Sequence, residues 1–370
     1  MQIDFHLGVT YILARMSGFS PFEANTIASA SQFVDDAVNQ GTILFQNRSA
    51  YQFICSAHRM LDYRNFKELA THHVWIPFHF IPGNEVRNNL VDPSVQRLIC
   101  RPNSDIAQDI VKSCVQNFHR PYGYHLLGVT THAYADTWAH QGFAGITHEV
   151  NRVGDIFDDA GSVDTEMLDY RDQYFKKGRY RPLWRKLFDT IAASFVSETS
   201  PIGHGPVLSY PDLPYLQWAY QDWQGQTVKR DNPKDYMEAI EHVLDFYARA
   251  REHNQLTTIK RQQTDLKRLE ELIRGLDHEE PEERLARWKT ETARGAFSFG
   301  QDTWSYSAEG VGSWLEEAFD WDNNDEFELI NVPFKNNFLT SNWKRMHDAL
   351  LFYRFSVLHE VLPKYDICVS

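Results

Sequence analysis

The feature that most constrains this chain is a set of ionisable side chains within an otherwise apolar segment, residues 122–142, whose pattern predicts a helix. An α-helix turns by about 100° per residue. Relative to His132, the side chains of His125, Asp136 and His140 are then displaced by only about 20°, 40° and 80°. All four project from one side of the helix. Burying such a cluster without a compensating ion would be costly, so the pattern favours a metal site.

The spacing along this helix also indicates how metal ions can be shared. His132 and His140 are separated by about 12 Å along the axis, too far to bind one ion. Asp136 lies one turn from each and has two oxygens, so it can bind a different ion through each. Imidazole nitrogen with carboxylate oxygen suits Zn²⁺, with Mn²⁺ or Fe²⁺ as alternatives. The alternative to a metal site is a plain i,i+4 surface pair, worth roughly a few tenths of a kcal/mol.

One helix offers too few ligands for two or three ions, so other ligands must come from elsewhere in the chain. Eleven of the sixteen histidines lie between His6 and His204. The further candidate ligands are His6, Asp35, Asp36, His58, His72, His73, His79 and His204. Each of these alone is more ordinarily a buried histidine or a surface acid, and only together do they suggest a site.

A second helix start is clear near the N-terminus. Ser20-Pro21-Phe22-Glu23 combines a capping serine, proline at the first helical position and glutamate three residues after the serine. Small side chains then recur at helical spacing and lead to Asp35 and Asp36. We expect another helix to approach this face closely.

Further segments with helical patterns are frequent, and strand-like alternation is scarce. Helices are expected at residues 4–16, 50–70, 104–119, 233–253, 257–275 and 342–360. Prolines make residues 72–83 irregular and 201–214 a rigid loop, residues 150–182 read as a loop-bearing segment, and residues 296–345 carry few periodic signals. The sequence therefore predicts an all-α fold, a multi-helix bundle with a metal-binding cleft and long irregular loops.

The 370 residues, 42% of them hydrophobic, suffice for a large core. We expect a metal-binding helical core in residues 1–215, with residues 216–370 as a helical C-terminal extension packed on it, in one continuous domain. The net charge of −13 disfavours long nucleic acid as a partner. No apolar run is long enough for a transmembrane segment. The N-terminus shows no secretory signal, so the expected location is the cytoplasm, with the four cysteines as free thiols. The oligomeric state is left open.

The order of the candidate ligands resembles that of the zinc-dependent phospholipase C and single-strand nuclease superfamily. The residues that match the superfamily pattern here are, in chain order, His6, then Asp35 or Asp36, then one of His58, His72, His73 and His79, and then His132-xxx-Asp136 and His140. Its closing position falls on His148 with Glu149 or on His204 with Asp212. The chain departs from the pattern in having Ala135 before Asp136, a short gap to His140, and no N-terminal Trp. The N-terminal Asp-Phe-His-Leu-Gly is similar to that of an uncharacterised bacterial family.

This resemblance implies an all-helical hydrolase with two or three zinc ions that cleaves a phosphoester with metal-activated water. The substrate class would be a nucleotide, a small phosphodiester or a lipid headgroup. Asp136 would bridge metals, and Asp35 or Asp36 would bind metal or orient the water, which makes these three the candidate catalytic residues.

Two other functions fit the same residues. The site could hydrolyse an amide or ester, or it could be a metal-stabilised binding protein without turnover. A helical HD-type phosphohydrolase is disfavoured, because the only adjacent His-Asp pair is His347-Asp348, near the end of the chain and without the surrounding ligand set.

Overall fold

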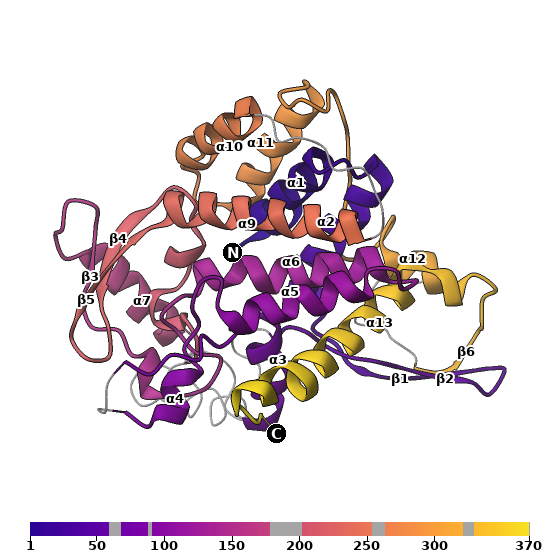
Figure 1. Ribbon diagram of the computed structural model, residues 1–370, viewed down its shortest axis with the longest axis horizontal. Coiled ribbons are helices and arrows are strands. Elements are labelled where there is room, and N and C mark those ends of the chain that lie inside the picture. The colour runs from indigo at the N-terminus through magenta and orange to yellow at the C-terminus, as the bar shows by residue number, and fades with distance from the viewer. Residues whose placement is uncertain (59–67, 88–90, 178–201, 254–262, 321–328, 370) are drawn as a thin grey trace.

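The computed structural model describes residues 1–58, 68–87, 91–177, 202–253, 263–320 and 329–369. The fold is mostly helical (Figure 1). Its principal helices are η1 (Asp4–Val9), α1 (Thr10–Met16), α2 (Pro21–Asp36), α3 (Glu68–Phe78), α4 (Pro93–Arg97), α5 (Asp105–Asn117), α6 (Gly123–Ala139), α7 (Thr165–Lys177), α9 (Asn232–His253), α10 (Gln263–Gly275), α11 (Pro281–Ala293), α12 (Trp314–Phe319) and α13 (Asn342–Phe355). Shorter helical turns are η3 (Glu149–Asn151), η5 (Gly205–Val207), η6 (Tyr210–Asp212), η8 (Phe338–Thr340), η9 (Ser356–Val361) and η10 (Leu362–Tyr365).

Two small sheets flank the helices, so the expectation of a purely all-α fold is wrong in this respect. The first sheet has the order β2-β1-β6, from β1 (Gly41–Phe45), β2 (Ala50–Phe53) and β6 (Ile330–Val332), with β2 antiparallel and β6 parallel to β1. The second has the antiparallel order β3-β4-β5, from β3 (Ile156–Phe157), β4 (Gln217–Gln221) and β5 (Thr227–Asp231). In Figure 1 the sheets lie on opposite sides of the helical body.

Helix α6 forms the centre of the fold, packed against α2, α5, α9 and α13. Every α6 residue except Tyr124 is buried. Its ionisable side chains are therefore inside the protein and must be satisfied by other segments of the chain. This is the environment that the sequence pattern of residues 122–142 predicted.

Close packing of α2 on α6 depends on small residues, as the sequence indicated. A Cβ atom at Gly128 would lie 2.3 Å from the carbonyl oxygen of Ile27 and 2.9 Å from the amide nitrogen of Ser31. The two backbones can therefore approach only because position 128 has no side chain. The approach brings the C-terminal end of α2 alongside the metal-ligand candidates of α6.

The predicted start of α2 is confirmed. The Ser20 hydroxyl accepts a hydrogen bond from the Glu23 amide at 3.4 Å, and the Glu23 carboxylate accepts one from the Ser20 amide at 2.8 Å. These reciprocal bonds satisfy two backbone donors that a helix N-terminus otherwise leaves unpaired. They fix where α2 begins and therefore which of its residues face α6.

Several other expected elements need correction. Residues 50–70 do not form one helix, because β2 occupies their start and residues 59–67 lie outside the described residues. Residues 72–83 are not irregular throughout, because α3 continues through Pro77, whose missing amide hydrogen costs the helix one hydrogen bond, to the carbonyl of His73. The segment 150–182 includes α7. Helices α5, α9 and α13 confirm three further predictions, and α10 confirms the part of 257–275 that is described.

One hydrophobic cluster runs through both halves of the chain. It joins Phe5 and Trp138 to Tyr247, Trp288 and Leu350 from the C-terminal part. A smaller cluster of Phe80, Phe143, Trp218 and Tyr220 lies around the second sheet. Among the residues that the structure describes, no helix is long and apolar enough to cross a membrane.

Candidate metal centre

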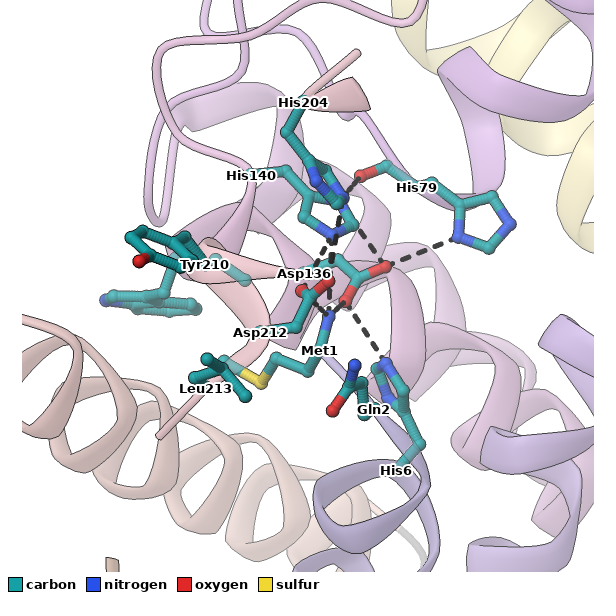
Figure 2. A network of polar contacts seen from close by, with 12 residues as sticks. Met1, Gln2, His6, His79, Asp136, His140, His204, Tyr210, Asp212 and Leu213 are labelled. Atoms are coloured by element: carbon teal, nitrogen blue, oxygen red, sulfur yellow. Dashed lines mark hydrogen bonds and ion pairs between the residues drawn. The ribbon is translucent and has the colours of Figure 1, made fainter. Parts of the chain in front are cut away.

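Histidine and aspartate side chains from five segments converge beside the C-terminal half of α6. Asp136 belongs to α6, and His140 follows directly after it. The others are His6 from η1, Asp35 from the end of α2, His79 just after α3, and His204 and Asp212 from the η5–η6 region. Figure 2 shows several of these side chains around Asp136 and the N-terminal amine of Met1.

The ligand atoms fall into three groups, in each of which they lie within 4.8 Å of one another. These groups are His6 with Asp35 and His132, His79 with His132 and Asp136, and His140 with His204 and Asp212. His132 belongs to two of them. The described residues therefore offer ligands for at least two separate ions.

Asp136 lies at the centre of this arrangement and is 1% exposed. Its Oδ2 is 3.3 Å from His132 Nε2 and 3.4 Å from His79 Nδ1. Its Oδ1 faces the other way, 3.2 Å from His6 Nε2 and 2.7 Å from the Met1 amine. The two oxygens of the carboxylate thus have different neighbours, but His140 also contacts Oδ2, with Nδ1 at 3.6 Å, so the expected division of His132 and His140 between the two oxygens is wrong.

Four of the histidines are held by backbone carbonyl groups. The contacts are His132 Nδ1 to Ser31 O at 2.9 Å, His79 Nε2 to Ser56 O at 2.9 Å, His140 Nδ1 to His79 O at 2.8 Å, and His204 Nδ1 to Leu208 O at 2.8 Å. A carbonyl oxygen only accepts, so the nitrogen that contacts it carries the proton. In a neutral imidazole the other nitrogen then has a free lone pair, and in all four residues it faces the site. This is how proteins commonly orient histidine ligands of metals.

The distance between two of these nitrogen atoms fits a tetrahedral metal ion. His79 Nδ1 and His132 Nε2 are 3.2 Å apart. Two acceptor nitrogens have no reason to approach so closely unless a proton or a cation lies between them. Ligands bound about 2.05 Å from a tetrahedral zinc ion are separated by about 3.3 Å. The distance between the two nitrogens is close to that value. A proton on His79 Nδ1 accounts for it equally, because burial opposes that charge but Asp136 and Asp35 outweigh the effect and raise the pKa of His79.

The buried His6 ring is a further side chain whose polar atoms are not fully satisfied within the described residues. Its ring stacks on that of His132 with a centroid distance of 3.7 Å, and it is fully buried. Its Nε2 lies 3.2 Å from Asp136 Oδ1, and its Nδ1 has no hydrogen-bond partner within the described residues. A buried polar atom without a hydrogen bond calls for a physical reason, and coordination of a cation supplies one.

The group of His140, His204 and Asp212 lies about one helical turn beyond Asp136, at the C-terminal end of α6. His140 Nε2 is 3.5 Å from Asp212 Oδ1, and His204 Nε2 is 3.7 Å from Asp212 Oδ2. The Met1 ammonium lies between the groups, 2.7 Å from Asp136 Oδ1 and 3.0 Å from Asp212 Oδ1. Burial opposes its charge, but the two carboxylates outweigh that effect and raise its pKa to about 11.

The electrostatics keep most of these side chains in the form that binds metal. Burial lowers the pKa of His6, His132 and His204 to about 4, so these imidazoles are neutral at pH 7. Burial opposes the charge of Asp136, but the nearby histidines and the Met1 ammonium hold its pKa well below the usual range. Neutral imidazole and ionised carboxylate are the protonation states that coordinate a metal.

Asp35 and Asp36 differ in orientation because consecutive residues of a helix point about 100° apart. Asp35 faces the site, with Oδ1 3.7 Å from His132 Nε2, and its side chain is 34% exposed. Asp36 instead accepts hydrogen bonds from Tyr306 and Gln32, and burial raises its pKa to about 6. Of the two candidates that the sequence left open, only Asp35 belongs to a ligand group.

Other candidates lie apart from the three groups. His58 has Nε2 3.6 Å from the sulfur of Cys55, and His148 caps η3 by accepting the Val150 amide at 3.2 Å. His72 and His73 are on α3 and belong to none of the groups. Of the two pairs considered for the last ligand position, His204 with Asp212 lies beside His140. Asp212 was expected only as the partner of His204 that the resemblance implied, and the Met1 ammonium was not expected at the site.

A buried ion pair fixes the N-terminal segment against this centre. Arg284 of α11 donates from Nε to Asp4 Oδ2 at 2.7 Å and from Nη2 to Gln2 Oε1 at 2.5 Å. Arg284 and Asp4 are both buried. Because His6 is only two residues beyond Asp4, this contact determines where its ring lies. No local sequence signal links residues so far apart in the chain.

The fold and the site together define a mainly helical protein with a buried histidine–aspartate cluster whose lone pairs converge as metal ligands do. The chain belongs to the family of unknown function DUF6765, which matches residues 1–361. No curated protein and no solved structure matches it. The family description specifies no activity, so the function has to be argued from the chemistry of the cluster.

Proposed function

We propose that this protein is a metal-dependent hydrolase, and specifically a phosphoesterase, that holds divalent ions of the Zn²⁺ type. The observation that carries the proposal is the set of four histidines tied to backbone carbonyls by one nitrogen, with the other nitrogen directed at carboxylates. A structural role alone would need no such convergence of lone pairs. Coordination of a cation accounts for it.

The two ions would be held by separate ligand groups. His79, His132 and Asp136 would hold one, with Asp35 and His6 near enough to complete or vary the set. His140, His204 and Asp212 would hold the other. The group of His140, His204 and Asp212 has three protein ligands, and catalytic zinc sites typically have three protein ligands and one open position. This favours catalysis over a closed structural site.

Two neighbouring divalent ions would ionise a water molecule and offset the charge that develops on a phosphoryl group. Asp136 would hold one ion together with His79 and His132, and its other oxygen pairs with the Met1 ammonium, which also contacts Asp212. Asp35 is the carboxylate of the site with the greatest exposure, so it can accept a hydrogen bond from water that enters and can direct it toward the substrate. The order of ligands along the chain, which resembles that of the phospholipase C and nuclease superfamily, supports phosphoester chemistry.

The metal content of purified protein tests the proposal. We expect about two equivalents of divalent metal, and a loss of about one equivalent in His132→Ala or His140→Ala. His278→Ala is the matched control, because that side chain is 55% exposed and pairs only with Glu283 among the described residues. A wild-type protein without metal after purification in the absence of chelators would overturn the proposal.

The bond that is cleaved requires a separate assay. Bis-aryl and mono-aryl phosphates should be hydrolysed by metal-loaded protein and not after chelation. Activity on an aryl ester alone would instead favour the amide or ester hydrolase. A metal-loaded protein that cleaves none of these substrates would favour the binding protein without turnover.

A further inference from the structure

A second cavity lies at the opposite end of α6 from the candidate metal centre. It has a volume of about 360 Å³ and lies where the N-termini of α6 and α13 meet the start of α2. Its walls include Phe22, Phe118, Arg120, Tyr124, His125 and Arg345. The volume is within the range of small-molecule sites, roughly 300–1,000 Å³. None of the candidate metal ligands lines it.

The cavity carries positive charge without a matching carboxylate. Arg345 makes no ion pair with any described residue, and its buried Nε has no hydrogen-bond partner. Within the described part of the chain, the Arg120 side chain donates only to the side-chain oxygen of Asn117, at 3.4 Å. In a chain of net charge −13, two arginines at one cavity without acidic partners are unusual. A bound anion would supply the partner that both lack.

The nearby acidic side chains are already engaged. Glu23 accepts the hydroxyl of Tyr124, and Glu317 accepts the side-chain amide of Asn342 at 3.2 Å. The 17-residue helix α6 begins beside the cavity without any side chain to cap its N-terminus. The partial positive charge of that helix end favours an anion at the same place.

His125 supplies an independent observation. It lines the cavity, is 2% exposed, and its Nδ1 has no hydrogen-bond partner among the described residues. Its Nε2 lies 3.1 Å from Asn342 Oδ1. Because the Asn342 amide nitrogen donates to Glu317, Asn342 offers its oxygen to His125, and Nε2 must carry the proton. Nδ1 therefore carries a buried lone pair that has no hydrogen-bond donor among the described residues, at a residue that lines the cavity.

Three aromatic side chains also line the cavity. Phe22 is 72% exposed, which is unusual for so large an apolar side chain, and Phe118 and Tyr124 lie beside it in the same cavity. Aromatic faces stack on planar rings. A phosphate ion alone would leave most of the cavity and these faces unused. The occupant therefore combines a phosphate with an aromatic group.

We propose that this cavity binds a small aromatic phosphomonoester, such as a nucleoside monophosphate, at a site separate from the metal centre. The phosphate lies against Arg120, Arg345 and the N-terminus of α6. The aromatic group lies against Phe22, Phe118 and Tyr124. The proposal does not depend on the function assigned to the metal centre.

Calorimetric titration of the full-length protein with adenosine monophosphate tests this site. We expect Arg345→Ala to weaken binding by about tenfold or more, since a charge-assisted hydrogen bond is lost, and Arg345→Lys to weaken it less. Arg87→Ala, at a 65% exposed arginine paired with Glu85, should bind as wild type does. Inorganic phosphate should bind more weakly than the nucleotide, and adenosine more weakly still. Circular dichroism checks that each variant is folded.

His132→Ala separates this cavity from the metal centre. We expect that variant to bind adenosine monophosphate with wild-type affinity. Loss of binding in His132→Ala with wild-type binding in Arg345→Ala would place the nucleotide at the metal centre and overturn the proposal. Wild-type protein that binds no nucleotide, or equal binding by Arg345→Ala and wild type, would overturn it as well.

Discussion

His125 and His132 lie on the same side of α6, two turns apart, yet their environments differ. Burial is the largest influence on both, lowering the pKa of His125 to about 3 and that of His132 to about 4. His132 donates a hydrogen bond from Nδ1 to a backbone carbonyl, and its Nε2 faces Asp136. His125 donates a hydrogen bond from Nε2 to the side-chain oxygen of Asn342, and it contacts no carboxylate among the described residues. Helical spacing thus places histidines on one face, but partners from other segments decide which of them can bind a metal.

The largest effect is expected from removing the carboxylate that distinguishes the two ends of α6. Asp136→Asn keeps the size of the side chain but loses its negative charge, so the ion held with His79 and His132 should be lost and metal content should fall by about one equivalent. His125→Asn, at the other end of the same face, should keep its metal. Elemental analysis of both proteins makes the comparison. Equal metal contents in the two variants would show that Asp136 does not organise the site.

The second largest effect is expected when Asp35 and Asp36, the neighbouring acids at the end of α2, are compared by their influence on kcat. Asp35→Asn should lower kcat on an aryl phosphate by about 100-fold, because a group that positions or deprotonates water is lost. Asp36→Asn is the matched control, since its carboxylate is bonded to Tyr306 and Gln32. Steady-state kinetics with metal content measured in parallel distinguishes lost catalysis from lost metal. A greater loss of kcat in Asp36→Asn would reverse the assignment.

The close approach of α2 and α6 should contribute a smaller, measurable stability. Gly128→Ala should lower the free energy of unfolding by about 1–3 kcal/mol, because the new Cβ forces two backbones apart. It should also weaken metal binding, since Ser31 and Asp35 lie on the displaced helix. Gly275→Ala, where a Cβ meets nothing within 4 Å, is the control. Urea denaturation of both variants gives the difference. Unchanged stability in Gly128→Ala would contradict the packing described above.

The smallest expected effect is on the pH dependence of the unfolding free energy, through the protonation of His125. Burial lowers the pKa of His125 from 6.5 to about 3, so between these values the unfolded chain binds a proton that the folded chain does not. Stability should therefore fall as the pH falls from 6.5, and no such effect should arise above it. His125→Asn should reduce the pH dependence of the unfolding free energy by less than about one proton per molecule. An unchanged slope would mean that His125 is not held neutral.

Much of this organisation could be predicted from local sequence. The capping residues Ser20 and Glu23 mark the start of α2, and the spacing of His132, Asp136 and His140 marks the central face of α6. Both signals act within a few residues, where helix geometry is fixed. The short strands, of two to five residues, gave no comparable pattern.

What the sequence could not decide depends on contacts between distant segments. The choice of Asp35 over Asp36 depends on how α2 is rotated against α6. The use of His204 and Asp212 depends on the path of a loop that returns to α6, and the burial of Met1 depends on Arg284 of α11. Pro77 within α3 shows that a proline near the end of a helix need not stop it.

Anomalous diffraction at the zinc absorption edge, from crystals of the metal-loaded protein, tests the central claim most directly. We predict an anomalous peak about 2.0–2.1 Å from both His79 Nδ1 and His132 Nε2, with a second peak between His140, His204 and Asp212. His132 Nδ1 should still contact the carbonyl of Ser31. A map without a peak among these side chains, while the histidines keep their places, would contradict the account.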